Sequence, residues 1–134
     1  MKQILLQEKF PIFKFEVSIQ QTDFKSAQEI INHFRSLIDA HPITRFIGEF
    51  DHYSHTLGLE EGEIADGIRD ARNIVFCFGT KLPNAEILAV RPRSIGVVEQ
   101  DDCFVISFME APMPLANDTM EKWVRSVITS AEAA

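Results

Sequence analysis

The stretch that decides the fold lies between residues 73 and 112 and contains NIVFCFG (73–79) and SIGVVEQDDCFVISFMEAP (94–112). It holds three apolar runs rich in Phe, Val and Ile, which is a composition typical of buried strands. The last two runs are separated only by Gln100, Asp101 and Asp102, whose number and polarity predict a hairpin turn. We therefore predict strands over Asn73–Phe78, Ser94–Glu99 and Cys103–Glu110.

Upstream of this stretch, the pattern predicts a strand, a helix and a second strand. From Lys9 to Ile19, apolar and polar residues alternate, which is the period of a sheet with one wet face. A helix with Asp23 as its N-cap follows, and Pro42 ends it. A strand is then expected from Ile43 to Asp51, with Phe46, Gly48 and Phe50 on one side and Arg45, Glu49 and Asp51 on the other. The apolar stripe of the helix has spacings of three and four and consists of Ala27, Ile30, Ile31, Phe34, Leu37 and Ile38.

Three further helical segments are expected. The acidic segment Gly58–Arg72 has the spacing of a short, poorly capped helix, and Asn84 is placed to cap a single turn in the connector Gly79–Arg93. The last helix begins near Asp118, which forms a capping box with Glu121 and precedes an apolar stripe that includes Trp123. We expect this helix to fray over Ser130–Ala134.

This order of elements predicts an α+β fold in a single domain, residues 1–134. Its sheet has five antiparallel strands, covered on one face by two long helices, in the order strand, helix, four strands, helix. The outer face of the strand at 103–110 is apolar enough to need cover, which predicts a homodimer joined through sheet faces or edges. That face consists of Cys103, Val105, Ser107 and Met109.

The bulk composition excludes several classes of protein. The chain has 134 residues and a formal net charge of -7, which repels phosphate backbones and disfavours nucleic-acid binding. Met1–Phe10 is too short and too polar for a signal peptide or a membrane span. The two cysteines, Cys77 and Cys103, fall inside predicted strands, so we expect buried, reduced thiols. A bacterial-type cytoplasmic location follows.

Several short motifs, in this order, resemble the bacterial domain-of-unknown-function 302 family. The resemblance covers roughly residues 23–116 and implies a TATA-binding-protein-like, helix-grip arrangement and a dimer, with no characterised chemistry. The motifs are Asp51-His52, Leu57-Gly58-Leu59-Glu60, Ile74–Gly79 leading into Lys81–Ala85, Pro92-Arg93-Ser94-Ile95, and Val98-Glu99.

The densest group of reactive residue types is the segment DHYSH at 51–55. If the strand ends at Asp51 and a helical turn begins there, His52 and His55 lie on one face, where two imidazoles can share a metal ion or line a haem or flavin pocket. If the strand continues, they point to opposite faces. A metal also needs a third ligand, for which the candidates are Glu49, Glu60, Glu61 and Glu63. The other interpretation is one partly buried histidine and one surface histidine.

Basic groups surround the turn at Asn84. Lys81, Arg91 and Arg93 near a helix N-terminus suit a carboxylate or a phosphate, whereas pairing with nearby acidic side chains would make them ordinary surface charges. The ligand-binding candidates are His52, His55, Lys81, Asn84 and Arg93.

Two functional hypotheses follow. The first is a non-enzymatic, homodimeric accessory domain that binds a small ligand or a partner segment between sheet and helix; its cofactor, if any, is unknown. The alternative is a metal- or haem-dependent enzyme or redox protein centred on His52 and His55. The sequence contains no recognisable catalytic motif and assigns no catalytic residue.

Overall fold

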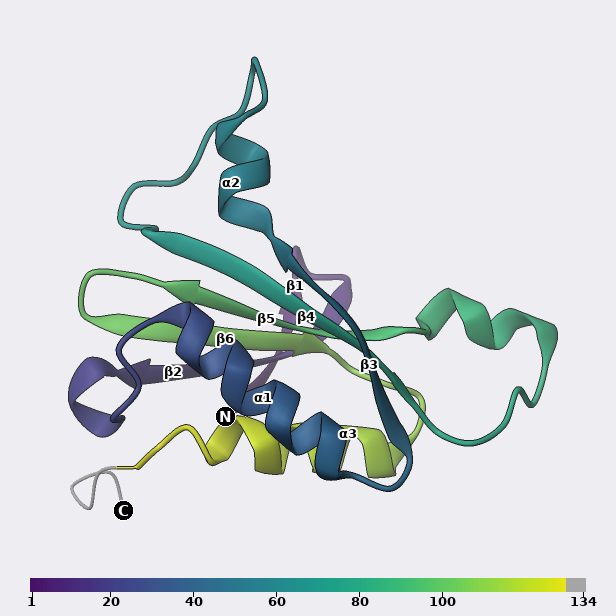
Figure 1. Ribbon diagram of the computed structural model, residues 1–134. Helices are drawn as coiled ribbons and strands as arrows, with labels where there is room; N and C mark the ends of the chain where they lie inside the picture. The colour runs from purple at the N-terminus through teal and green to yellow at the C-terminus, as the bar shows by residue number, and fades with distance from the viewer. Residues whose placement is uncertain (130–134) are drawn as a thin grey trace.

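A computed structural model describes residues 1–129, and within them the chain forms one antiparallel sheet of six strands (Figure 1). Across the sheet the strands follow the order β1-β2-β6-β5-β4-β3, and every neighbouring pair is antiparallel. The predicted fraying of residues 130–134 lies outside the described residues. The strands are β1 (Lys2–Leu6), β2 (Phe10–Ser18), β3 (Thr44–Asp51), β4 (Asp70–Phe78), β5 (Arg93–Glu99) and β6 (Cys103–Met109).

Two helices, α1 (Ala27–Ala40) and α3 (Pro114–Arg125), lie on the same face of this sheet (Figure 1). The ring of Trp123 on α3 packs edge-on against Phe76 on β4, with 5.5 Å between ring centroids. The apolar stripe of α1 packs against β3, β4 and β5. A shorter helix, α2 (His52–Leu57), continues from the end of β3, and two 3-10 turns complete the fold, η1 (Ile19–Gln21) and η2 (Ala85–Val90).

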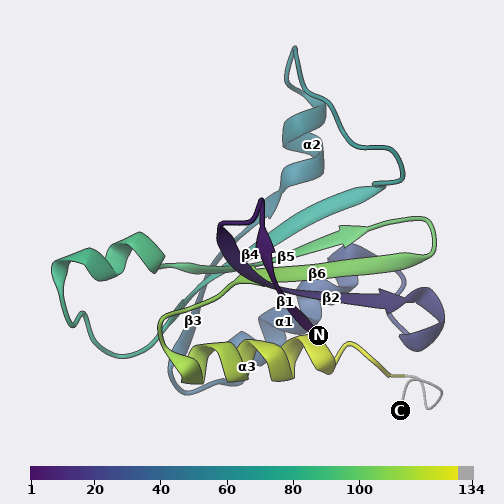
Figure 2. The same ribbon diagram turned by 180° about the vertical axis from the view of Figure 1, so that it is seen from behind.

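The hydrophobic core fills the space between the sheet and these two helices. Alternate residues of the central strands point into it, including Phe76, Ile95 and Phe104, and the largest side chains there are fully buried. We call the opposite side of the sheet the open face. Figure 2 shows β1 and its turn into β2 rising on that side, away from α1 and α3. The open face carries Ile12, Val75, Cys77, Ser94, Gly96, Ser107 and Met109.

The prediction of five strands and two long helices is wrong. The sixth strand, β1, was missed because Lys2–Leu6 is an edge strand whose residues are mostly exposed, so it lacks the apolar alternation of a buried strand. The helices α1 and α3 have 14 and 12 residues, which is close to the average length of about 11–12 residues for globular proteins. The TATA-binding-protein-like, helix-grip arrangement is therefore not matched.

The caps predicted for the two longest helices, α1 and α3, are also wrong. Helix α1 is capped by Ser26, whose side-chain oxygen accepts the backbone N–H of Glu29 at 3.1 Å, and not by Asp23. Helix α3 begins at Pro114, before the predicted capping box. Proline suits the first helical position because its fixed φ is already helical and the N–H that it lacks would have no partner there.

A β-bulge in β3 changes which side chains share a face. Phe46 pairs with Phe76, but Gly48 pairs with Val75, so Ile47 is an extra residue between them. As a result Phe46 packs against the core while Phe50 lies on the open face, although the alternation predicted them on one side. The expectation of two buried thiols is wrong as well, because Cys77 is exposed on the open face and Cys103 is only partly buried.

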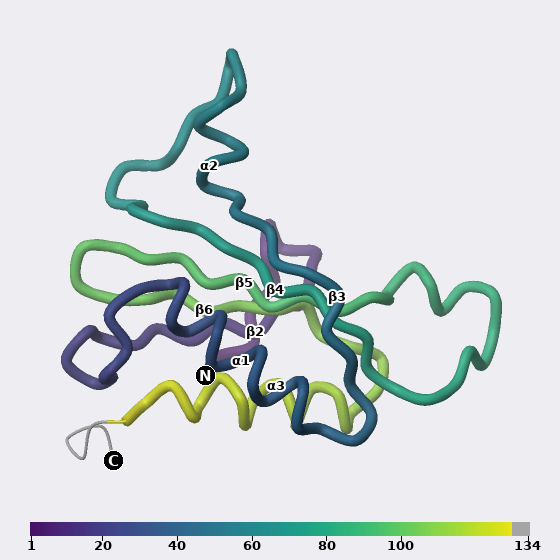
Figure 3. The backbone as a smooth tube through the Cα atoms, in the orientation of Figure 1, coloured from purple at the N-terminus to yellow at the C-terminus, as the bar shows by residue number. Residues whose placement is uncertain are grey.

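The predicted hairpin between the last two strands is confirmed. β5 ends at Glu99 and β6 begins at Cys103, and the backbone N–H of Gln100 donates to the Cys103 carbonyl at 2.9 Å. The connectors on either side of β4 are longer than this turn, and Figure 3 shows them extending in different directions. We call residues 52–69 the first connector and residues 79–92 the second connector.

Candidate functional site

The first connector begins with the two histidines that the sequence singled out. The strand β3 ends at Asp51, whose carboxylate caps α2 by accepting the backbone N–H of Ser54 at 3.0 Å and its hydroxyl at 2.8 Å. The Ser54 backbone hydrogen bond, followed by the bond from its hydroxyl, lowers the pKa of Asp51. The helical turn therefore places His52 and His55 on one face, with ring centroids 5.9 Å apart.

The surroundings of these histidines offer little to a metal ion. Both rings pack against Phe50 and are exposed, and His52 Nδ1 lies 3.1 Å from the Thr56 hydroxyl. Glu49, one of the candidates for the third metal ligand, pairs with Ile74 in the sheet and so lies on the opposite face from Phe50. Within residues 1–129, no group of three or more His, Cys, Asp or Glu side chains is arranged to hold a metal.

The second connector contains the other candidates, but it separates them. Lys81 and Asn84 are exposed, and Asn84 precedes η2 without a side-chain capping bond. The Lys81 carbonyl accepts a hydrogen bond from Arg91 Nη1. Arg93, by contrast, is 6% exposed, the most buried charged residue of the described chain.

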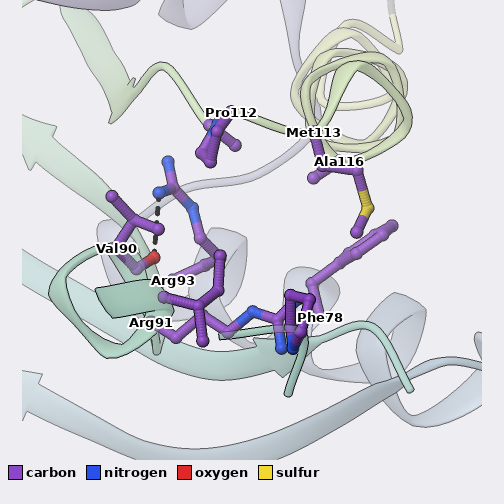
Figure 4. Close-up of a pocket in the computed structure, with 10 residues that line it drawn as sticks. Phe78, Val90, Arg91, Arg93, Pro112, Met113 and Ala116 are labelled. Atoms are coloured by element: carbon purple, nitrogen blue, oxygen red, sulfur yellow. Dashed lines mark hydrogen bonds between the residues drawn. The ribbon is translucent and has the colours of Figure 1, made fainter. Parts of the chain in front are cut away.

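A hollow of ≈ 170 Å³ lies where the second connector, the end of the sheet and the start of α3 meet (Figure 4). We call it the Arg93 pocket. Phe78 comes from β4 and Arg93 from β5, while Ala111 to Ala116 lead into α3 and its first turn. Apart from Arg91 and Arg93, the wall of the pocket is apolar, and it contains no acidic residue. The lining residues are Phe78, Pro83, Ile87, Val90, Arg91, Arg93, Ala111, Pro112, Met113 and Ala116.

The guanidinium of Arg93 is held in this wall by main-chain carbonyls. Nη1 donates to the Val90 carbonyl at 3.1 Å, the bond drawn in Figure 4, and Nη2 donates to the Met109 carbonyl. Nε is buried and has no hydrogen-bond partner. Burial lowers the pKa of Arg93, because the charged form loses its hydration. No carboxylate within the described residues forms an ion pair with it.

Arg91 forms a different part of the same wall. Its side chain extends beside Phe78, while the guanidinium of Arg93 points toward Pro112 (Figure 4). Gly79 makes room for Arg91: its φ is +111°, and a Cβ at this position would lie 3.1 Å from Arg91 Nη2. A side chain at residue 79 would therefore be strained and would also crowd Arg91.

The sequence identified Arg93 as a candidate but missed the apolar wall. Ala111, Met113 and Ala116 were assigned to a connector between the sheet and a helix expected to begin at Asp118. The two prolines at 112 and 114 are the available signal, since Pro114 starts α3 four residues earlier than we expected and brings Ala116 against the sheet.

Comparison with known protein families gives one match. A family model described as "Family of unknown function (DUF6858)" matches residues 1–129. The chain belongs to this family. The resemblance to another family of unknown function is thus confirmed only at the level of an uncharacterised domain, since the family number differs and its fold is not matched.

The other comparisons are negative: neither a curated protein nor a solved structure matches this member of the DUF6858 family. Among residues 1–129, no helix combines the length and the apolar character needed to cross a bilayer. The function must therefore be argued from the site itself.

Proposed function

We propose that this DUF6858 protein is a non-enzymatic binding domain that takes up a small molecule in the Arg93 pocket. The observation that carries the proposal is a buried guanidinium without an ionic partner in the wall of an apolar hollow. Ligand sites are commonly concave and mostly apolar, with a few polar groups that orient the ligand. The Arg93 pocket has this composition and lies between sheet and helix, where the sequence led us to expect a ligand.

The energetic cost of Arg93 supports a functional role. A buried charge costs several kcal/mol of desolvation unless it is paired, and buried polar atoms are nearly always hydrogen-bonded. The core beneath the sheet is filled by apolar side chains, so a methionine or leucine at residue 93 would satisfy packing more simply. A bound ligand that supplies polar atoms to Arg93 would offset this cost.

The alternative site at His52 and His55 receives less support. Its two rings are exposed, they contact each other and Phe50, and Glu49 lies across the sheet. Lys81 and Asn84 also lie outside the lining of the Arg93 pocket. We therefore place the ligand at Arg93 and treat the other four candidates as peripheral.

Chemical-shift mapping by NMR tests the binding proposal with a library of fragments. Compounds that bind should shift the amides of Ala111 and Ala116. An Ala116→Leu variant should fill the hollow, weaken these compounds at least tenfold and change the free energy of unfolding by less than about 1 kcal/mol, because the pocket accommodates the added carbons.

The matched control is Ala40→Leu, the same substitution at an exposed position of α1. It should leave every affinity unchanged. If no compound shifts amides around the pocket, or if Ala116→Leu binds as the wild type does, the proposal is wrong.

We further propose that the protein is a homodimer of the cytoplasm, joined through the open face. Apolar side chains on this side remain exposed, including Ile47 at 52% and Met109 at 49%, whereas α1 and α3 cover the other face (Figure 1). Such surfaces often mark protein–protein contacts. The two unpaired cysteines suit a reducing compartment.

Light scattering coupled to size-exclusion chromatography tests the dimer. Ile47→Glu should yield a monomer, since it places a charge in the apolar interface. Leu115→Glu, on the exposed side of α3, is the control and should remain dimeric. A wild-type protein that is monomeric at micromolar concentration would exclude the dimer.

A further inference from the structure

We infer that the ligand of the Arg93 pocket is a small apolar monocarboxylate, comparable in size to benzoate. This inference rests on the proposed binding function and narrows it to a chemical class. Three properties of the pocket lead to it: its charge, the donors of Arg93, and its volume.

The charge of the pocket is unusual for this chain. The protein carries 20 acidic residues against 13 basic ones, yet the wall has two arginines and no acid. Four of the other five arginines of the described chain contact carboxylates, whereas Arg91, Arg93 and the exposed Arg45 have no such partner. A cationic, mostly apolar hollow in an acidic protein attracts an anion. The paired arginines are Arg35, Arg69, Arg72 and Arg125.

The donors of Arg93 favour a carboxylate. A guanidinium has five N–H groups. The carbonyls of Val90 and Met109 occupy two of them and Nε is buried, which leaves one N–H on Nη1 and one on Nη2 for another acceptor. These carbonyls also fix the orientation of the planar group, so little side-chain entropy remains to be lost when a ligand binds. A carboxylate accepts two parallel N–H groups from one guanidinium edge.

A single negative charge fits better than a phosphate. Arg93 is the only buried cation in the wall, because Arg91 is partly exposed and its side chain extends beside Phe78. One buried cation neutralises one carboxylate, whereas a phosphate dianion would bring a second charge into a mostly apolar wall at a large desolvation cost. The exposed Lys81 does not line the pocket and cannot supply the second buried cation. The apolar part of the ligand would then contact Phe78, Val90 and Met113.

The volume limits the size of this apolar part. The hollow measures ≈ 170 Å³. An engineered protein cavity of about 150 Å³ lined by apolar side chains binds benzene. A single aromatic ring or a short branched chain therefore fills the Arg93 pocket, and the carboxylate extends from that ring or chain to Arg93.

Isothermal titration calorimetry with benzoate and its neutral analogue benzyl alcohol tests the inference. Benzoate should bind the wild type about 10- to 100-fold more tightly, as expected for a hydrogen bond to a charged group. Arg93→Met should remove this difference while benzyl alcohol binding changes less than about threefold, because the ring site remains. Arg45→Met, at an exposed arginine of β3, is the matched control and should behave as the wild type does.

Arg93→Lys guards against a folding defect in the methionine variant. It keeps the charge but not the two-donor edge, so benzoate should bind with an affinity between those of the wild type and Arg93→Met. Benzoate affinity should also stay constant from pH 5.5 to 8, because an arginine and a carboxylate keep their charges over this range.

The outcomes separate the two proposals. If benzyl alcohol binds as tightly as benzoate and Ala116→Leu blocks both, the carboxylate inference fails and the binding function stands. If phenyl phosphate binds more tightly than benzoate, the single-charge argument fails. If neither benzoate nor any fragment produces a response that Ala116→Leu removes, both proposals fail together.

Discussion

The two connectors that flank β4 differ in whether the polar groups beside them are exposed or buried. The first connector contains His52, His55 and most acidic residues of the segment Gly58–Arg72. It has no buried residue, and its polar groups meet close neighbours or solvent, as the Ser54 hydroxyl does when it donates to Asp51. The second connector has few reactive residue types but packs over Arg93 and helps to enclose it. A density of reactive residue types in the sequence therefore does not predict where a charge is buried without a partner.

The connectors differ because of where they return to the sheet. The first extends beyond the end of β3 and meets little except β4 (Figure 3). The second connector returns into β5 beside the start of α3. Pro83, Ile87 and Val90 therefore face both a helix and the end of the sheet. Three elements meeting at one place leave a hollow, whereas an extended loop leaves only surface.

Removing a large wall residue of the pocket should have the largest effect on this contrast. Phe78→Ala should lower the free energy of unfolding by about 3–5 kcal/mol, because it empties a buried aromatic site. Leu59→Ala, at an exposed leucine of the first connector, should cost less than about 0.5 kcal/mol. Urea denaturation measures both. Equal costs would mean that the first connector packs against something as firmly as the pocket wall does.

Two arginines allow a sharper test of pairing. Arg72→Met should destabilise the protein by about 1–2 kcal/mol, because Arg72 is half-buried and its Nε donates to Asp70 at 2.8 Å. Arg93→Met should change the stability of the ligand-free protein by less than about 1 kcal/mol or raise it, since a buried, unpaired cation is removed. Urea denaturation without ligand compares them. A larger loss for Arg93→Met would make Arg93 a structural residue.

The smallest effect is expected at the cap of α2. Asp51→Ala should speed hydrogen exchange at the Ser54 amide without changing global stability measurably, while Asp51→Asn should keep the cap, since asparagine is an equally good N-cap. The pKa of Asp51 is lowered in the folded protein. Its stabilising contribution is therefore complete above the ordinary pKa of 3.8 and is lost as pH falls through the folded value. Exchange unaffected by Asp51→Ala would contradict this cap.

Much of the fold was predictable from local pattern. The predicted strands correspond closely to β4, β5 and β6, and the predicted turn at 100–102 lies between the last two. The predicted strands cover residues 73–78, 94–99 and 103–110. They were predictable because the apolar runs of buried strands can be recognised in the sequence without knowing how the strands pair. The edge strand β1 was not predictable in this way, since an exposed edge has no apolar face to mark it. The bulge at Ile47 leaves no mark in the alternation either, and it reversed the faces assigned to Phe50 and Gly48.

The candidate site was only partly predictable. Arg93 was among the candidates because of its residue type, and the placement of His52 and His55 on one face was one of two alternatives that the sequence left open. The burial of Arg93 and the wall formed by Ala111, Met113 and Ala116 required the path of the chain after Pro112.

The sequence alone determined which segments are buried. The spacing of apolar residues in each strand and helix is a local property, and the hydrophobic effect removes the apolar side of each element from water. Only the tertiary structure decided which of its thirteen basic side chains loses its water without gaining an acid. That outcome depends on how three segments distant in sequence meet around Arg93, and no local pattern encodes a distance between segments.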